Sequence, residues 1–372
     1  MDFTLSDERR MLQDSLSRYL ADNLDHERRR KTLDSGAPYD ADLFKGLADL
    51  GTLAALFPEE AGGFGGTGPD LALVFETLGR AGTLEPFLPA ALAAPLLTDH
   101  AGLVEQIIAG DSIVTLAHTE PDARYDLADV TLPAKPTLNG TKTNVLYGAQ
   151  ATHLIVSARE TGDRFSPEGI SLFLVPTDAP GVAITPITNV DGTASAQATF
   201  TGTPADTPIG TPGKGHALLE TAIAHAILAL SAETLGAMEA TKHLTLAYLQ
   251  DRQQFGRPIG TFQALQHRLA DMLTEIEQAR SAVINLAGHL DAPRDTRERH
   301  VSATKNLIGR VAALVAEEAI QMHGGIGMTQ EYALSHHARR LVMADHLFGD
   351  VDHHLERFIH LSGGERDDGP GA

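Results

Sequence analysis

A block of short β-branched runs in the middle of the chain constrains its fold most strongly. Turn-forming residues, such as Asn139-Gly140 and Asp191-Gly192, separate these runs from one another. Such a pattern predicts short strands joined by tight turns, so residues 111–212 are expected to form an all-β barrel or sandwich. The expected strands are Ile113–Leu116, Val130–Leu132, Leu154–Val156, Ile170–Val175 and Val182–Ile184.

Helical patterns lie on both sides of this block. Before it, Ser6 can cap a helix in which leucines recur at helical spacing from Leu12 to Leu24. After it, three long segments rich in alanine and leucine predict helices over 216–249, 262–290 and 297–323 that pack closely on one another and on a second subunit. The expected fold class is α+β multidomain, with an N-terminal all-α domain (1–110), a middle β domain (111–212), a C-terminal helical bundle (213–362) and a disordered tail (363–372).

Composition excludes several classes of function. The chain has no cysteine, which removes disulfides, thiolate metal sites and nucleophilic thiols. Its net charge of −20 argues against nucleic-acid binding, which needs a basic face. By sequence alone no apolar run is expected to be long enough to cross a bilayer, and no targeting segment is expected at the start, so a cytoplasmic protein without a membrane partner is predicted. No metal site is expected either, and one histidine-rich stretch is interpreted as surface: His336-His337, His346 and His353-His354.

Two segments of the helical part have the residue types of a phosphate-binding site. In Asp251–Ile259, Arg252 lies one turn from the end of a helix, where it can bind a phosphate group, and Phe255 offers a ring nearby. By itself this pattern is more often a capping arginine beside a buried phenylalanine. In Gln321–Met328, paired glycines allow a ligand to approach the backbone, although most such glycine runs are turns. His323 alone is more typical of a packed histidine than of a ligand.

Taken together, the order and spacing of these segments resemble the C-terminal domain of the acyl-CoA dehydrogenase family. The resemblance covers nearly the whole chain: Phe3–Glu8 is similar to the family's N-terminal start, Pro58–Gly63 to its Pro-Glu-Glu-x-Gly-Gly turn, and Thr119-Glu120-Pro121 to its flavin-side loop. It implies a helical domain, a β domain and a four-helix bundle, with FAD between the last two and its adenine end reaching a neighbouring subunit.

The resemblance also implies roles for individual residues. Thr119 would lie near the flavin ring, and the reaction would be α,β-dehydrogenation of an acyl-CoA thioester, in which a carboxylate removes the α-proton and hydride passes to the flavin. Electron-transfer flavoprotein is the implied electron acceptor. Two further groups would contact the adenine and pyrophosphate end of FAD: Arg252, Gln254, Phe255 and Gln263 from one subunit, and Gln321, Gly324 and Gly325 from the adjoining subunit.

The sequence departs from the family pattern at three places. The loop after Pro121 reads Asp122-Ala123-Arg124-Tyr125 instead of small residues, and Asn144-Val145-Leu146 replaces the family's Trp-Ile-Thr. The two positions where members carry the catalytic glutamate hold Ala226 and Phe348. Asp350 is the nearest carboxylate to the second position and is the candidate base, the alternative being a solvated or FAD-side carboxylate. The N–H of Phe348 can polarise a thioester carbonyl in either case.

These departures resemble the small-subunit type of heteromeric acyl-CoA dehydrogenases, which act on bulky or dicarboxylic acyl-CoA esters, steroid fragments included. The residues that carry this resemblance are Tyr248, Gln266-His267-Arg268 and Leu347–Asp350. A catalytic subunit of a homo- or hetero-oligomer and a non-catalytic partner that shares FAD both fit the sequence. An oxygen-using flavoprotein relative is a third alternative.

Overall fold

The computed structural model describes residues 5–363 of the chain, and the expected features at Phe3, Thr4 and 364–372 lie outside them. The N-terminal part is helical, as expected. Ser6 caps the first helix, because its hydroxyl accepts a hydrogen bond from the N–H of Arg9 at 3.3 Å. The helices of this part are α1 (Asp7–Asn23), α2 (His26–Asp34), α3 (Ala41–Asp49), α4 (Gly68–Ala81), α5 (Phe87–Ala93) and α6 (Ala101–Ile108).

The middle part forms two small sheets, with strand orders β1-β3-β4-β7 and β2-β6-β5. One expected strand is absent: Val130–Leu132 is an irregular segment, because the N–H groups of Thr131 and Leu132 donate to the Glu120 carboxylate instead of to a strand. The strands are β1 (Val114–Ala117), β2 (Leu138–Leu146), β3 (His153–Arg159), β4 (Ile170–Pro176), β5 (Val182–Thr188), β6 (Ala194–Thr203) and β7 (Pro208–Ile209).

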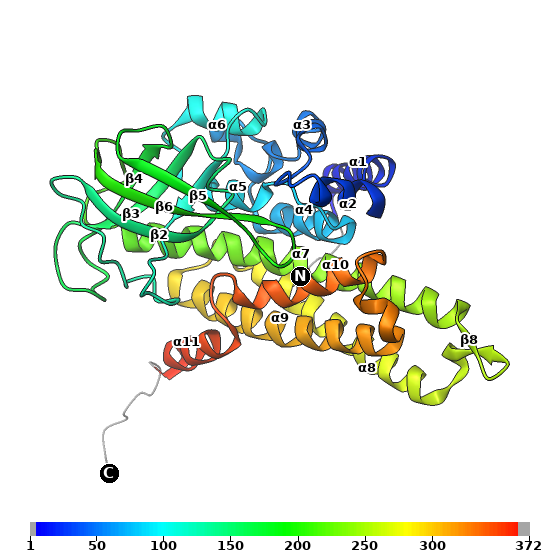
Figure 1. Ribbon diagram of the computed structural model, residues 1–372. Coiled ribbons are helices and arrows are strands. Elements are labelled where there is room, and N and C mark those ends of the chain that lie inside the picture. The colour runs from blue at the N-terminus through cyan, green and yellow to red at the C-terminus, as the bar shows by residue number, and fades with distance from the viewer. Residues whose placement is uncertain (1–4, 364–372) are drawn as a thin grey trace, which may run out of the picture.

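The C-terminal part is a helical bundle, and the expected fold class is confirmed. A small hairpin, β8 (Gln253–Gln254) with β9 (Arg257–Pro258), lies at one end of the bundle, and α11 lies at the other (Figure 1). Gly363 ends α11, so the expected tail does not begin there; the domain boundaries at 110 and 212 stay a prediction. The helices are α7 (Gly215–Asp251), α8 (Gln263–Ala287), α9 (Arg294–His323), α10 (Ala333–His346) and α11 (Val351–Gly363).

Helix α7 is the central element, since it lies between the N-terminal helices and the rest of the bundle (Figure 1). It crosses α4 so closely that a Cβ on Gly79 would lie 1.9 Å from the carbonyl oxygen of Glu233, and one on Gly236 would lie 2.0 Å from that of Glu76. By length and composition α7 could also span a bilayer, which the sequence analysis missed. However, 78% of its most apolar window is buried inside the fold, as in the core helix of a soluble protein.

Candidate active site

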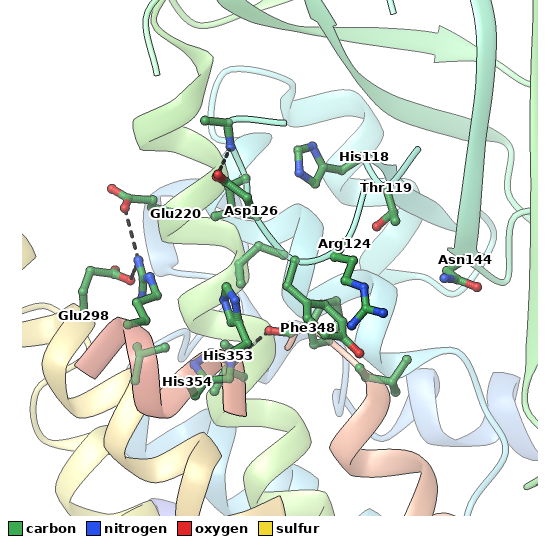
Figure 2. Close-up of a pocket in the computed structure, with 18 of the residues that line it drawn as sticks. His118, Thr119, Arg124, Asp126, Asn144, Glu220, Glu298, Phe348, His353 and His354 are labelled. Carbon is green, nitrogen blue, oxygen red and sulfur yellow. Dashed lines mark hydrogen bonds and ion pairs between the residues drawn. The ribbon is translucent and has the colours of Figure 1, made fainter. Parts of the chain in front are cut away.

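A cavity of about 760 Å³ lies where the β sheets meet the bundle. Thr119 and Asn144 line it on the β side, Glu220 and Ile223 of α7 line it on the bundle side, and the loop between α10 and α11 closes it through Phe348 (Figure 2). Six of the chain's 17 histidines line the same cavity, including His118 and His353. Its wall is therefore rich in groups that can exchange protons or form hydrogen bonds.

The β-side wall is held by a buried ion pair. Lys142 is fully buried and donates to Glu120 at 2.8 Å, to the carbonyl of His118 at 2.9 Å and to Ser157 at 3.1 Å. Burial lowers the pKa of Lys142 to about 8. Burial alone would raise the pKa of Glu120. The charge of Lys142 and the hydrogen bonds that the Glu120 carboxylate accepts outweigh burial, so the pKa of Glu120 is lowered. This network fixes the backbone around Thr119.

His118 faces the cavity in its neutral form. Its Nδ1 lies 2.9 Å from the hydroxyl oxygen of Ser157, and burial, with a contribution from Lys142, lowers its pKa to about 3. Sequence reasoning missed this residue, because nothing in the pattern around Thr119 shows which side chains of the strand face inward.

Two of the three residues that replace the family's flavin contact line the cavity, and the third is buried in the fold. Asn144 has a φ of 53° at an irregularity in the pairing of β2 with β6, and its amide lies on the cavity wall (Figure 2). Leu146 also lines the cavity, whereas Val145 is fully buried. An amide thus stands where the family has an indole, and an aliphatic side chain stands where it has a hydroxyl.

The loop before α11 is tied down at each residue. Phe348 has a φ of 58°, and its carbonyl accepts a hydrogen bond from Nε2 of His354 at 3.0 Å. The next carbonyl, of Gly349, accepts one from the buried Lys305 at 2.6 Å. Asp350 then caps α11, since its carboxylate accepts the N–H of His353 at 2.9 Å. Asp350 is not among the residues that line the cavity, and its role as base stays a prediction.

Two buried glutamates, Glu220 and Glu298, line the cavity and are paired with arginines nearer the surface (Figure 2). Arg294 makes two hydrogen bonds of 2.6 Å with Glu220, and Arg357 lies 3.2 Å from Glu220 and 2.7 Å from Glu298. Burial opposes ionisation of Glu220, but the hydrogen bonds and charge of Arg294 lower its pKa overall. The sequence offered one signal for this face that was not used: Glu220, Ile223 and Ile227 recur at helical spacing and all line the cavity.

The expected FAD-binding residues other than Thr119 lie at the opposite end of the bundle (Figure 1). Tyr248, one turn before Arg252, stacks on His323 with ring centroids 4.4 Å apart, which brings the end of α7 beside the segment after α9. Phe255 is 91% exposed, so the alternative of a buried phenylalanine is wrong. His323 is packed, as expected for a lone histidine. The expected residues exposed at this end are Arg252, Gln254, Phe255, Gln263, Gln321, Gly324 and Gly325.

The histidine-rich stretch is not all surface. His336 is buried and lies 2.7 Å from a guanidinium nitrogen of Arg29, and His354 is 2% exposed. The interpretation as surface is therefore wrong for these two residues. Their ring nitrogens satisfy buried polar groups of the fold, and within residues 5–363 no group of histidine and carboxylate side chains is arranged to hold a metal ion.

Models of three domains of one family match the chain in order. The model described as "Acyl-CoA dehydrogenase, N-terminal domain" matches residues 6–106, the middle-domain model matches 115–202, and the C-terminal-domain model matches 213–357. The chain belongs to the acyl-CoA dehydrogenase family. It is 30% identical over 384 residues to the probable acyl-CoA dehydrogenase YngJ of Bacillus subtilis, with 96% of this chain and 98% of YngJ covered.

Solved structures also match nearly the whole chain. The FAD complex of PigA has a TM-score of 0.87 at 27% identity, covering 98% of this chain and 99% of PigA. The Tcur3481-Tcur3483 steroid ACAD has a TM-score of 0.87 at 29% identity, covering 97% and 99%. The family, the enzyme class and the FAD cofactor expected from the sequence motifs agree with these matches.

Proposed function

We propose that this chain catalyses α,β-dehydrogenation of an acyl-CoA thioester, with FAD, as a subunit of an oligomer. The observation that carries the proposal is the cavity between the β sheets and the bundle, with polar side chains at Thr119 and Asn144 on one wall and a fixed loop at Phe348 on the other. FAD bound against the first wall would supply the hydride acceptor, while the chain's own residues would orient the substrate and remove its proton.

The residues present fit FAD as two half-sites. The hydroxyl of Thr119 and the amide of Asn144 can hydrogen-bond to the polar edge of a flavin ring. At the other end of the bundle, a Cβ built on Gly324 or Gly325 would meet nothing within 4 Å, so this backbone is open to a ligand. The exposed Arg252 nearby can pair with a pyrophosphate. Because the two groups lie at opposite ends of the bundle, each FAD would take its ring contacts from one subunit and its phosphate contacts from another.

Two groups of the cavity wall suit an anionic thioester as substrate. Arg124 lines the cavity without an ion pair among the described residues, so it can attract a phosphate of coenzyme A, whereas Arg294 and Arg357 are paired with carboxylates. The N–H of Phe348 donates to no acceptor among the described residues. A main-chain donor fixed in this way can polarise a thioester carbonyl in the cavity.

The acyl group is proposed to be bulky, and a steroid-derived group is one such substrate. Similarity to the Tcur3481-Tcur3483 steroid ACAD supports this substrate class, and electron-transfer flavoprotein is the proposed acceptor. The test is anaerobic bleaching of the bound flavin by a panel of straight-chain, dicarboxylic and steroid-derived acyl-CoA thioesters. Bleaching by at least one thioester, with electrons passed on to electron-transfer flavoprotein, is expected. A flavin that stays oxidised with every thioester would overturn the proposal.

A second candidate function is that of a non-catalytic subunit which shares FAD with a different chain. The observation that favours it is the absence of a carboxylate at both family positions, Ala226 and Phe348, combined with the capping role of Asp350. The two candidates differ in the visible spectrum of the chain purified alone. About one FAD per chain supports the first candidate, and a colourless chain that gains flavin only with a partner subunit supports the second.

A further inference from the structure

His353 occupies a distinctive place in the cavity. It lies in the first turn of α11, three residues after the cap Asp350, and lines the cavity beside Phe348 (Figure 2). Its ring packs against Tyr125 with centroids 5.4 Å apart, and against His354 at 5.0 Å. Neither ring nitrogen of His353 has a hydrogen-bond partner among the residues the structure describes. Its ring is therefore held in place by packing while both nitrogens stay available.

Two of the carboxylates that line the cavity are held by arginines: Glu220 is paired with Arg294, and Glu298 lies 2.6 Å from Arg297. Asp126 is exposed and accepts the N–H of Ala128 at 2.8 Å. Glu220, whose pKa is lowered by its arginines, is a weak proton acceptor, because protonating it would break the pair. Glu356 also lines the cavity, but it is exposed and lies one turn farther along α11.

Four of the other five histidines of this cavity are less available than His353, and the fifth, His216, lies in the first turn of α7 and not on the loop before α11. Both ring nitrogens of His354 face partners, Ser302 at 3.4 Å and the carbonyl of Phe348 at 3.0 Å. His118 has Ser157 at one ring nitrogen, while His346 and His360 are exposed. Among the histidines of this cavity, His353 combines a fixed ring with unpaired nitrogens beside the loop that closes the site.

The surroundings of His353 favour its neutral form. Burial, and then the charge of Arg357, lower its pKa, while the nearby carboxylates have a smaller, opposite effect. Because its pKa lies below the ordinary value of about 6.5, the imidazole is uncharged at neutral pH and can accept a proton. The titratable groups around it are Tyr125, Asp126, Asp350, His354, Glu356 and Arg357.

We propose that His353 is the proton acceptor of this site, in place of the glutamate that is absent at Ala226 and Phe348. The inference rests on the proposed function. The α-carbon of the acyl thioester gives its proton to a ring nitrogen of His353, which becomes imidazolium. The electron pair of that C–H bond would form the α,β double bond, and FAD, when bound, would supply the acceptor for the hydride that leaves the β-carbon. Asp350 is then a positioning residue, because it caps the helix that carries His353.

The test separates proton removal from hydride transfer. Exchange of the α-hydrogen of a bound acyl-CoA with D2O is followed by mass spectrometry, together with anaerobic flavin reduction. In His353→Phe, which keeps the ring contact with Tyr125, exchange is expected to fall by ~10²-fold or more, the typical contribution of a general base, while FAD stays bound. Added imidazole is expected to restore exchange in His353→Gly. His243→Gln, on the exposed side of α7, is the matched control and should exchange normally.

Three outcomes would overturn the inference. Wild-type rates of exchange and flavin reduction in His353→Phe would remove His353 from the reaction while leaving the proposed function intact. Loss of exchange in Glu356→Gln or Asp350→Asn, with His353→Phe still active, would assign the base to that carboxylate. A wild-type protein that neither exchanges nor bleaches with any acyl-CoA would end the proposed function and this inference together. If His353→Phe does not retain FAD, His353→Gln and the imidazole rescue decide.

Discussion

The carboxylate of Asp350 lies 2.9 Å from the backbone nitrogen of His353 and caps α11, the helix that carries this histidine in its first turn. A single hydrogen bond thus connects the carboxylate that the sequence pointed to with the histidine that faces the cavity. The sequence motif locates this loop but does not show where its side chains point. Neighbouring residues of the loop differ in this respect, since some side chains enter the cavity and another caps the helix.

Replacing Asp350 separates a capping role from a catalytic one. Asparagine also caps helices well, so Asp350→Asn is expected to keep the stability of the fold and to reduce its flavin within a few-fold of the wild-type rate. Asp350→Ala is expected to lose about 1 kcal/mol of unfolding free energy, a typical value for the loss of a cap. Urea unfolding and stopped-flow flavin reduction measure the two effects. An Asp350→Asn protein that folds normally, keeps FAD and never reduces it would show that Asp350 is the base.

The crossing of α4 and α7 predicts a steric effect at Gly236. A methyl group there would lie 2.0 Å from the carbonyl oxygen of Glu76, which belongs to backbone and cannot rotate away. Gly236→Ala is expected to destabilise the protein by roughly 1–3 kcal/mol, the usual range for overpacking, even though alanine favours helix. Gly102→Ala in α6 is the matched control, because its Cβ would meet nothing within 4 Å. The prediction fails if the two variants have the same urea midpoint.

Buried neutral histidines predict acid sensitivity. Burial, with the nearby charge of Lys305, lowers the pKa of His354 to about 3, whereas an unfolded chain has a value near 6.5. Between these values the unfolded state binds more protons, so the stability due to neutral His354 is complete above pH 6.5 and is lost as the pH falls toward 3. In His354→Gln, the loss of unfolding free energy between pH 7 and pH 4.5 is expected to be smaller than in the wild type. Urea unfolding at both pH values measures this loss, and an equal loss in the two proteins would contradict the prediction.

Sequence reasoning predicted the helices and most strands well because their signals are local. The limits expected for the third long helix, 297–323, differ from those of α9 by three residues at one end. The strand expected at Val130–Leu132 failed because its backbone partners are the carboxylate oxygens of Glu120, and no local pattern reports a side chain that takes the place of a neighbouring strand.

The site was predictable only in part, for a similar reason. Motif spacing found Thr119 and the residues at the far end of the bundle, since these belong to continuous segments. The cavity, in contrast, joins side chains from strands, from α7 and from the start of α11, and only packing of the whole chain brings His118, Glu220 and His353 together. The absence of a glutamate at the two family positions was visible in the sequence, whereas the place of His353 on the cavity wall was not.

The two separated half-sites predict how the exposed end of the bundle behaves. Phe255 is 91% exposed in a single chain, so Phe255→Ala should leave the unfolding free energy of the chain unchanged. If this end contributes to the FAD site of a neighbouring subunit, Phe255→Ala and Arg252→Ala are expected to lower the FAD content per chain and to release flavin more readily on dilution. Met11→Ala, at a residue of α1 that is 63% exposed, is the control and should keep its full flavin content. Absorbance at the flavin band, set against protein concentration after gel filtration, measures the ratio. Equal FAD content in all three variants would show that a single subunit holds its cofactor without help from the bundle end of a neighbour.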